Sequence, residues 1–140
     1  MGRVRRVQHV SVGIAAGREA EARAFYTAAL GLTEKPRPLG LTEKPRPLGL
    51  KHNSVIWFDA GGDEHEVHLL STPDYVAPQG NHLCLEVDDL AAMRAHMDQQ
   101  GVPIVEVAAI DARPRFVVND PFGNGIELTQ ITGIFTPVNE

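Results

Sequence analysis

Hydrophobic and polar residues alternate along several short segments of this chain, and this alternation predicts β-strands. In residues 82–87, HLCLEV, every second residue is apolar, which leaves His82, Cys84 and Glu86 together on the polar face. In residues 125–130, GIELTQ, the same rule places Glu127 on a polar face. If the sheet curls with its polar face inward, His82 and Glu127 converge in a concave site of the kind that binds ligands.

A helix and two further strands are predicted between these segments. Residues 90–100, LAAMRAHMDQQ, have apolar residues at helical spacing, and we expect Leu90, Met93 and Met97 to face the core. The other elements are two strands and a turn: 102–108 (VPIVEVA), 115–120 (RFVVND) and 121–124 (PFGN). The second half of the chain therefore predicts one βαβββ module.

The first half repeats this order. Residues 7–14, VQHVSVGI, alternate in phase with residues 82–87 and place His9, Ser11 and Gly13 on the polar face. A helix is predicted next, at 18–32, and it ends near Gly31. It is followed by a strand at 54–60 (SVIWFDA), a turn at 61–64 (GGDE) and a strand at 66–71 (EVHLLS). We expect Phe25 and Tyr26 to be aromatic residues that pack the helix.

Residue counting aligns the two halves. Glu66 follows Asp59 by seven positions, and Glu127 also follows Asp120 by seven positions, so Glu66 corresponds to Glu127. The predicted class is α+β, with two βαβββ modules in one domain. The boundaries are 1–140 for the domain, 1–71 for module 1, 72–81 for a linker rich in Pro and Gly, and 82–140 for module 2.

A nine-residue sequence, GLTEKPRPL, occurs twice without change, at 31–39 and 40–48. The period is far shorter than solenoid repeats, and the prolines exclude a helix interior or a central strand. We interpret 33–50 as a surface loop lengthened by duplication, which has a modest entropic cost. The alternative is that both copies fit one groove, which would make the loop a conformational switch or a segment exchanged between subunits.

Composition excludes several classes of protein. The chain has 140 residues, 43% of them hydrophobic and 22% charged, as expected of one globular domain. A single cysteine excludes an internal disulfide framework and favours a reducing, cytoplasmic location. There is no signal-peptide pattern or membrane-length apolar run. The net charge of -5 argues against nucleic acid as a partner.

The segments QHVSVGI, AFYTAALGL, NHLCLEVDDL and above all FVVNDPFGNGIEL give the chain a family resemblance. It resembles the vicinal oxygen chelate superfamily, which includes glyoxalase I, bleomycin-resistance proteins and extradiol dioxygenases. The resemblance implies a mixed sheet curled into a cup with the helices outside. It also implies a divalent metal held by His9, Glu66, His82 and Glu127.

Two imidazoles and two carboxylates suit a borderline divalent ion such as Zn, Ni, Co, Fe or Mn. In a six-coordinate geometry, two adjacent positions remain for a small substrate that chelates the metal through neighbouring oxygens. The metal would stabilise charge on an enolate or enediolate oxygen, and Glu66 or Glu127 would act as the catalytic general base. We therefore expect a metal-dependent glyoxalase-like enzyme of the lyase or isomerase type.

Other residues leave alternatives open. His68 lies on the same face as Glu66 and could replace it as a ligand. We expect Cys84 to be a small, buried, neutral thiol. The Arg113–Arg115 stretch either binds an anionic substrate group or forms a solvated basic loop, and the latter is favoured. We assign no role to three further histidines, His52, His65 and His96.

The main alternative function is a metal-free protein that sequesters a small molecule, as bleomycin-resistance proteins do. The intact ligand types and the aromatic content of 6% disfavour it. A ring-cleaving dioxygenase is a second alternative, because its three-ligand arrangement remains possible if Glu66 is not bound. Fosfomycin-type thiol transfer has only the shared His and Glu positions in its favour. The resemblance also implies a homodimer, in which cups could form within one chain or across two.

Overall fold

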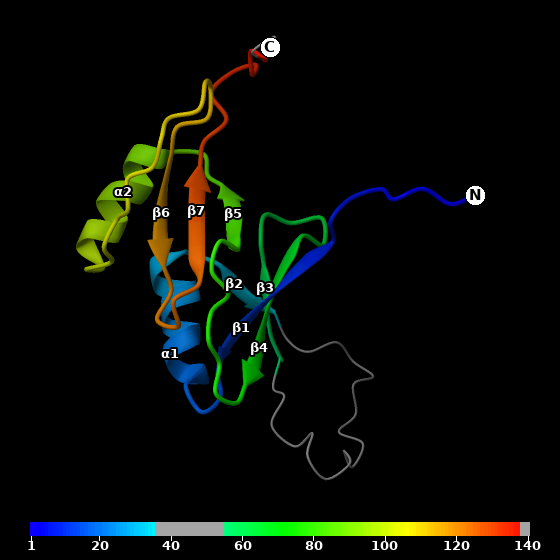
Figure 1. Cartoon of the computed structure of the whole chain (residues 1–140), viewed down its shortest axis with the longest axis vertical. Coiled ribbons are helices and arrows are strands. Elements are labelled where there is room, and N and C mark those ends of the chain that lie inside the picture. The colour runs from blue at the N-terminus through cyan, green and yellow to red at the C-terminus, as the bar shows by residue number, and fades with distance from the viewer. Residues whose placement is uncertain (36–54, 138–140) are drawn as a thin grey trace. The chain divides into compact units, whose positions relative to one another are not determined.

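The computed structural model describes residues 1–35 and 55–137, and the chain forms two compact units, residues 1–77 and 78–140. Unit 1 contains β1 (His9–Ala15), α1 (Glu19–Ala24), a π-helix η1 (Phe25–Ala29), β2 (Thr33–Lys35), β3 (Val55–Asp59) and β4 (Glu66–Thr72). Unit 2 contains β5 (His82–Glu86), α2 (Leu90–Gln99), β6 (Arg115–Asn119) and β7 (Gly125–Thr129) (Figure 1). The predicted α+β class is confirmed, and the boundary between the units falls within the predicted linker.

Unit 1 is built on a four-stranded sheet with the order β1-β4-β3-β2. β1 runs parallel to β4, whereas β3 is antiparallel to both of its neighbours. One face of the sheet is buried, because alternate residues of the strands are apolar. The buried apolar side chains on β3 and β4 are Ile56, Phe58, Val67 and Leu69, each at most 2% exposed.

The helical segment of unit 1 covers this buried face. Tyr26 is fully buried, and its ring stacks on that of Phe58 with 5.7 Å between centroids. Such an aromatic pair stabilises a core by about 0.5–1.5 kcal/mol beyond its area burial. The segment ends at Gly31, as predicted, where a φ of +72° favours glycine. The change from α- to π-helical geometry at Phe25 was not predicted.

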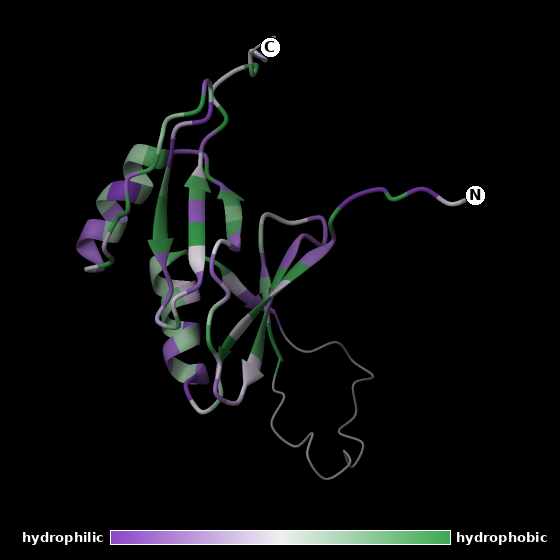
Figure 2. Ribbon diagram, viewed as in Figure 1, coloured by the Kyte–Doolittle hydropathy of each residue, from purple (hydrophilic) through white to green (hydrophobic). Residues whose placement is uncertain are grey.

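Unit 2 has a three-stranded sheet with the order β5-β7-β6, and β5 runs parallel to β7. Figure 2 shows the alternation of hydrophobic and hydrophilic residues as bands along β7. Helix α2 begins after Asp89, whose carboxylate accepts a hydrogen bond from the Ala92 N–H at 2.9 Å. Leu90 and Met97 are buried as predicted, whereas Met93 is half-buried. Among the described residues, no helix has the length and apolar character needed to cross a membrane.

The strand predicted at residues 102–108 is wrong. Within this segment only Val105 pairs with β6, through two hydrogen bonds to Val117 of 2.8 and 3.0 Å. Pro103 lacks an N–H donor, and Val105 is 45% exposed, so neither backbone nor side chain supports a longer strand here.

The loop predicted at residues 33–50 is corrected at its start. Thr33–Lys35, from the first copy of the repeated nonapeptide, forms the edge strand β2 against β3. The sequence excluded the repeat from central strands but not from edge strands, so the position of β2 at the edge of the sheet agrees with that prediction. Residues 36–48 of the repeat and His52 lie outside the described residues, as do the two explanations offered for the duplication.

The turn between β6 and β7 is held by one buried carboxylate. Asp120 is 5% exposed, and its Oδ1 accepts hydrogen bonds from the backbone N–H groups of Phe122 and Asn124, both at 2.9 Å. Its Oδ2 accepts a further bond of 2.7 Å from the Asn124 amide. This turn fixes where β7 begins and therefore which side chains of β7 lie on each face.

We predict that Asp120→Ala lowers the free energy of unfolding by about 2–4 kcal/mol, because buried donors lose a charged acceptor. Urea unfolding followed by circular dichroism measures this difference. Asp88→Ala, which removes an exposed carboxylate from the same unit, is the control and should change the free energy by less than about 0.5 kcal/mol. Equal effects of the two substitutions would contradict the role of Asp120.

Candidate functional site

The outward face of the unit 1 sheet has its polar side chains in two cross-strand rows. In the first row His9 pairs with Glu66, which pairs with Asp59. In the second row Ser11 pairs with His68, His68 with Trp57, and Trp57 with Lys35. The predicted residues His9 and Glu66 therefore lie opposite each other on neighbouring strands.

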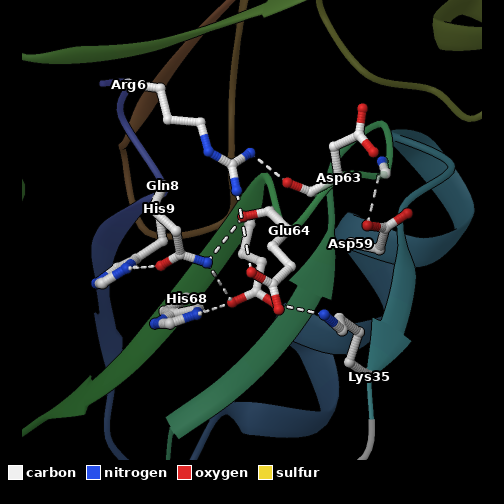
Figure 3. Close-up of polar contacts among 10 residues, drawn as sticks. Arg6, Gln8, His9, Lys35, Asp59, Asp63, Glu64 and His68 are labelled. Atoms are coloured by element: carbon white, nitrogen blue, oxygen red, sulfur yellow. Dashed lines mark hydrogen bonds and ion pairs between the residues drawn. The ribbon is translucent and has the colours of Figure 1, made fainter.

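Glu66 contacts three side chains, those of Gln8, Lys35 and His68, which are labelled in Figure 3. Its Oε2 forms an ion pair with Lys35, and its Oε1 lies 3.1 Å from His68 Nε2 and 3.2 Å from Gln8 Nε2. The hydrogen bond from Lys35 lowers the pKa of Glu66 from 4.5 to about 2, against the opposing effect of burial. Glu66 is thus ionised over the whole physiological range.

Three rings stack on the same face. His68, which is 6% exposed, lies between Trp57 and His9 with ring centroids 4.1 and 4.2 Å away. The rings are nearly parallel, with interplanar angles of 19° and 16°. His9 is exposed, and its Nδ1 lies 2.6 Å from Gln8 Oε1. His68 is therefore held in place by stacking on both sides and by Glu66 at its edge.

These residues line a pocket of about 520 Å³. Its walls combine the ring stack with charged and polar groups; its lining residues are Gln8, His9, Lys35, Trp57, Glu64, Glu66 and His68. Pockets of this size bind small molecules. Lys35 was not singled out in the sequence, because its reach to Glu66 depends on the pairing of β2 with β3.

Unit 2 brings together its own predicted pair. His82 Nε2 lies 3.0 Å from Glu127 Oε2, and Arg115 Nη1 lies 3.1 Å from the other carboxylate oxygen. Glu127 is buried, whereas His82 is about half exposed. Arg115 also donates to the Ala108 carbonyl and begins β6, so the expected solvated basic loop is wrong at this residue.

Cys84 lies directly across from Glu127 on the neighbouring strand, because the two Cα atoms are paired in the parallel register. We expected a buried thiol, but Cys84 is exposed, since β5 is an edge strand of its sheet. Although the residue is exposed, partial desolvation of its sulfur, and to a smaller extent the Glu127 charge, raise the pKa of the thiol. The thiol is therefore neutral at physiological pH, as expected.

The strand registers of the two units can be superimposed through their buried pairs. Phe58 pairs with Val67 in unit 1, and Val118 pairs with Ile126 in unit 2. In this superposition Val67 of β4 matches Ile126 of β7. The next residue on each strand is His68 and Glu127, so these two residues are counterparts. On the parallel strands, Ser11 pairs with His68 and Cys84 with Glu127. His9 and His82 each stand two residues before that pairing position, so they too are counterparts.

Residue counting paired Glu66 with Glu127 because it assumed hairpins of equal length. In the structure Asp59 pairs with Glu66, whereas the matching pair in unit 2 is Asn119 with Gly125. The first hairpin therefore has one more residue between its strands. The signal available in the sequence was the burial pattern of the strands, which aligns without reference to the turns.

The donor chemistry of these residues fits a borderline divalent ion, since it combines imidazoles with ionised carboxylate. The geometry of unit 1 fits less well. A histidine binds a metal through a lone pair in the plane of its ring, so the parallel rings of His9 and His68 do not aim at one point. Ligation by both requires the exposed His9 ring to turn. Among the described residues, no group of three or more His, Cys, Asp or Glu side chains is arranged to hold an ion.

We predict that Glu66 stabilises the fold above pH 4.5 and that this contribution is lost as the pH falls towards about 2. The pKa in the folded state is depressed, so protonation favours unfolding through this interval. The measurement is the difference in free energy of unfolding between wild type and Glu66→Gln as a function of pH. In a Lys35→Met background the pKa of Glu66 in the folded state is less depressed, so the loss should be smaller and should end at a higher pH. An unchanged profile would contradict the role of Lys35.

Comparison with known proteins agrees with this architecture. The family model described as Glyoxalase/Bleomycin resistance protein/Dioxygenase superfamily matches residues 6–128. A crystal structure of a protein from Bacillus anthracis assigned to the glyoxalase family is 27% identical, with a TM-score of 0.78, covering 94% of this chain and 98% of that one.

Two more distant structures share the fold. An antibiotic binding protein from a Streptomyces species is 21% identical with a TM-score of 0.66, and covers 94% of this chain and 99% of that one. A glyoxalase/dioxygenase from Nostoc punctiforme is 20% identical with a TM-score of 0.69, and covers 92% of both chains. No curated protein matches the chain. The family model spans most of the chain, including the predicted pairs His9 with Glu66 and His82 with Glu127. The chain therefore belongs to the glyoxalase, bleomycin resistance protein and dioxygenase superfamily.

Proposed function

We propose that this chain is a metal-dependent, glyoxalase-like enzyme of the lyase or isomerase type. Its substrate is a small molecule that binds a divalent ion through oxygens on neighbouring atoms. Of the ligands expected from the sequence, His9, His82 and Glu127 are retained, and the strand register favours His68 over Glu66 at the fourth position. Three imidazoles and one carboxylate remain a suitable set for Zn, Ni, Co, Fe or Mn.

One observation carries this proposal: both units present a donor pair at the same register of parallel neighbouring strands. In unit 2 the pair is already in contact, with 3.0 Å between His82 Nε2 and Glu127 Oε2. Two unrelated solvated side chains would have no reason to recur at equivalent positions in both units. The matching positions are what a shared ligand-binding role would produce.

Each unit also supplies groups that orient the donors. Glu66 bonds to His68 Nε2, which fixes the ring and leaves the other nitrogen as the donor to a metal. Arg115 contacts one carboxylate oxygen of Glu127, and His82 contacts the other. A bound divalent ion would supply Lewis-acid polarisation of a substrate oxygen.

Glu127 is the better candidate for the general base. A base works best when its pKa lies near the operating pH, and Lys35 moves the pKa of Glu66 to about 2. Glu66 is therefore a weak base, and its role is to orient the His68 ring through the contact with Nε2. In this proposal Glu127 takes the proton from the substrate carbon next to the chelating oxygens, and Arg115 keeps its carboxylate in position.

A second candidate function is metal-free binding of a small molecule. The observation in its favour is the unit 1 pocket, in which Trp57, His68 and His9 already form a stack and Lys35 already neutralises Glu66. A planar molecule could extend such a stack without any metal. The homodimer and the cytoplasmic location remain predictions.

The first test is elemental analysis of purified wild-type protein and of His82→Ala. We expect wild type to hold a stoichiometric divalent metal. His82→Ala should lower the metal affinity by more than the roughly 10–100-fold that is typical when a residue hydrogen-bonded to a ligand is removed. His65→Ala, which removes an exposed histidine outside the proposed set, is the matched control and should keep the metal.

Metal-free wild-type protein that also fails to take up metal on addition would overturn the enzyme proposal. If that protein still bound small molecules with a change in Trp57 fluorescence, the second candidate would replace it. Loss of metal from the His65→Ala variant would contradict the assignment of ligands.

A further inference from the structure

The outward face of the unit 1 sheet changes character along its strands. Beyond the row of Ser11, His68 and Trp57 comes a third row, in which Gly13 pairs with Leu70 and Leu70 pairs with Val55. This row has no polar side chain. Leu70 is 38% exposed, although its strand neighbours Leu69 and Ser71 are buried. An exposed leucine thus adjoins the polar pocket on the same face.

Tyr75 adds an aromatic ring to this row. A Cβ placed on Gly13 would lie 2.7 Å from both Cδ2 and Cζ of the Tyr75 ring, which is closer than real contacts allow. Because alternate side chains of a strand share a face, the ring lies on the face of His9 and Ser11. Gly13 has no positive φ, so the glycine is there for space and not for backbone conformation.

The spacing of the rows sets the size of a molecule that could touch all of them. Residues two apart on a strand are separated by about 6.5–7 Å, so the apolar row lies about 7 Å from the His68 row and about 13 Å from the His9 row. A molecule with a compact polar end and a chain of a few carbon atoms spans this distance.

We propose that the substrate is amphipathic, with its oxygen-bearing end at His9 and His68 and an alkyl or aryl group lying on Leu70 against the Tyr75 ring. This inference rests on the proposed function for the position of the polar end. Its new content is the apolar subsite, formed by Leu70, Val55 and Tyr75. Tyr75 and Leu70 would then set substrate preference without taking part in proton transfer.

The apolar subsite predicts how affinity depends on chain length. Each methylene transferred from water onto an apolar surface contributes enough free energy to tighten binding about fourfold when fully buried. Leu70 remains part of an open face, so we expect a two- to fourfold gain for each methylene. The gain should end once the chain passes beyond the Leu70 row.

The chain contains one tryptophan, and Trp57 pairs with His68 in the row next to Leu70. Its fluorescence therefore reports on this face. The probes are straight-chain alkyl hydroxamates from acetohydroxamate to octanohydroxamate, which present two neighbouring oxygens and differ only in their tails. Each is titrated into the full chain with and without one equivalent of Ni²⁺. We expect the dissociation constant to fall with tail length in both series.

Three variants locate the subsite. Leu70→Thr and Tyr75→Ala should each reduce the gain per methylene to less than about 1.5-fold, while acetohydroxamate binds as it does to wild type. Gly13→Ala should act like Tyr75→Ala, because the added methyl group displaces the ring. Val76→Thr, at an 83% exposed neighbour of Tyr75, is the matched control and should keep the full gain.

A dissociation constant independent of tail length, or a full gain in the Leu70→Thr variant, would overturn the apolar subsite. Failure of the metal proposal gives a different pattern, in which Ni²⁺ has no effect on any probe while the dependence on tail length persists. Circular dichroism spectra like that of the wild type for each variant separate loss of the subsite from loss of the fold.

Discussion

A strand whose alternate residues are buried has no freedom in where its remaining side chains point. In unit 1 the buried apolar residues at alternate positions of β4 are Val67 and Leu69, at 1% and 0% exposure, and a shift by one residue would turn both to the opposite face. Burial of each contributes about 1.5–3 kcal/mol, so such a shift is excluded on energetic grounds. The outward direction of Glu66 and His68 is therefore a consequence of core packing. The site depends on this constraint before it depends on any polar contact.

The same constraint acts in unit 2 and makes the two outward faces comparable. Ile126 and Leu128 fix the direction of Glu127 as Val67 and Leu69 fix that of His68. Glu66 then takes a different part from Glu127: paired with Lys35, it anchors the edge of the His68 ring. The lowered pKa of Glu66 agrees with this orienting role, because a carboxylate that transfers protons needs a pKa closer to neutrality.

Much of this could be predicted from the sequence. Strand alternation located β1, β4, β5 and β7 and placed His9, Glu66, His82 and Glu127 on polar faces, because period-2 burial is a local property. The choice between Glu66 and His68 could not be made, since both share one face and an extra hairpin residue broke the count. The contact of Lys35 with Glu66 and the position of Tyr75 over Gly13 were also out of reach. They join segments distant in sequence, and no local pattern encodes such contacts.

The central claim is that strand register, and not residue type, decides which side chain of unit 1 corresponds to Glu127, the proposed metal ligand of unit 2. Isothermal titration of Ni²⁺ into His68→Ala and Glu66→Gln, compared with wild type, tests this most directly. The account predicts that His68→Ala weakens metal binding by more than about 100-fold, whereas Glu66→Gln, which removes only the outer-shell partner, weakens it by about 10–100-fold. A Glu66→Gln variant that loses the metal while His68→Ala retains it would contradict the account.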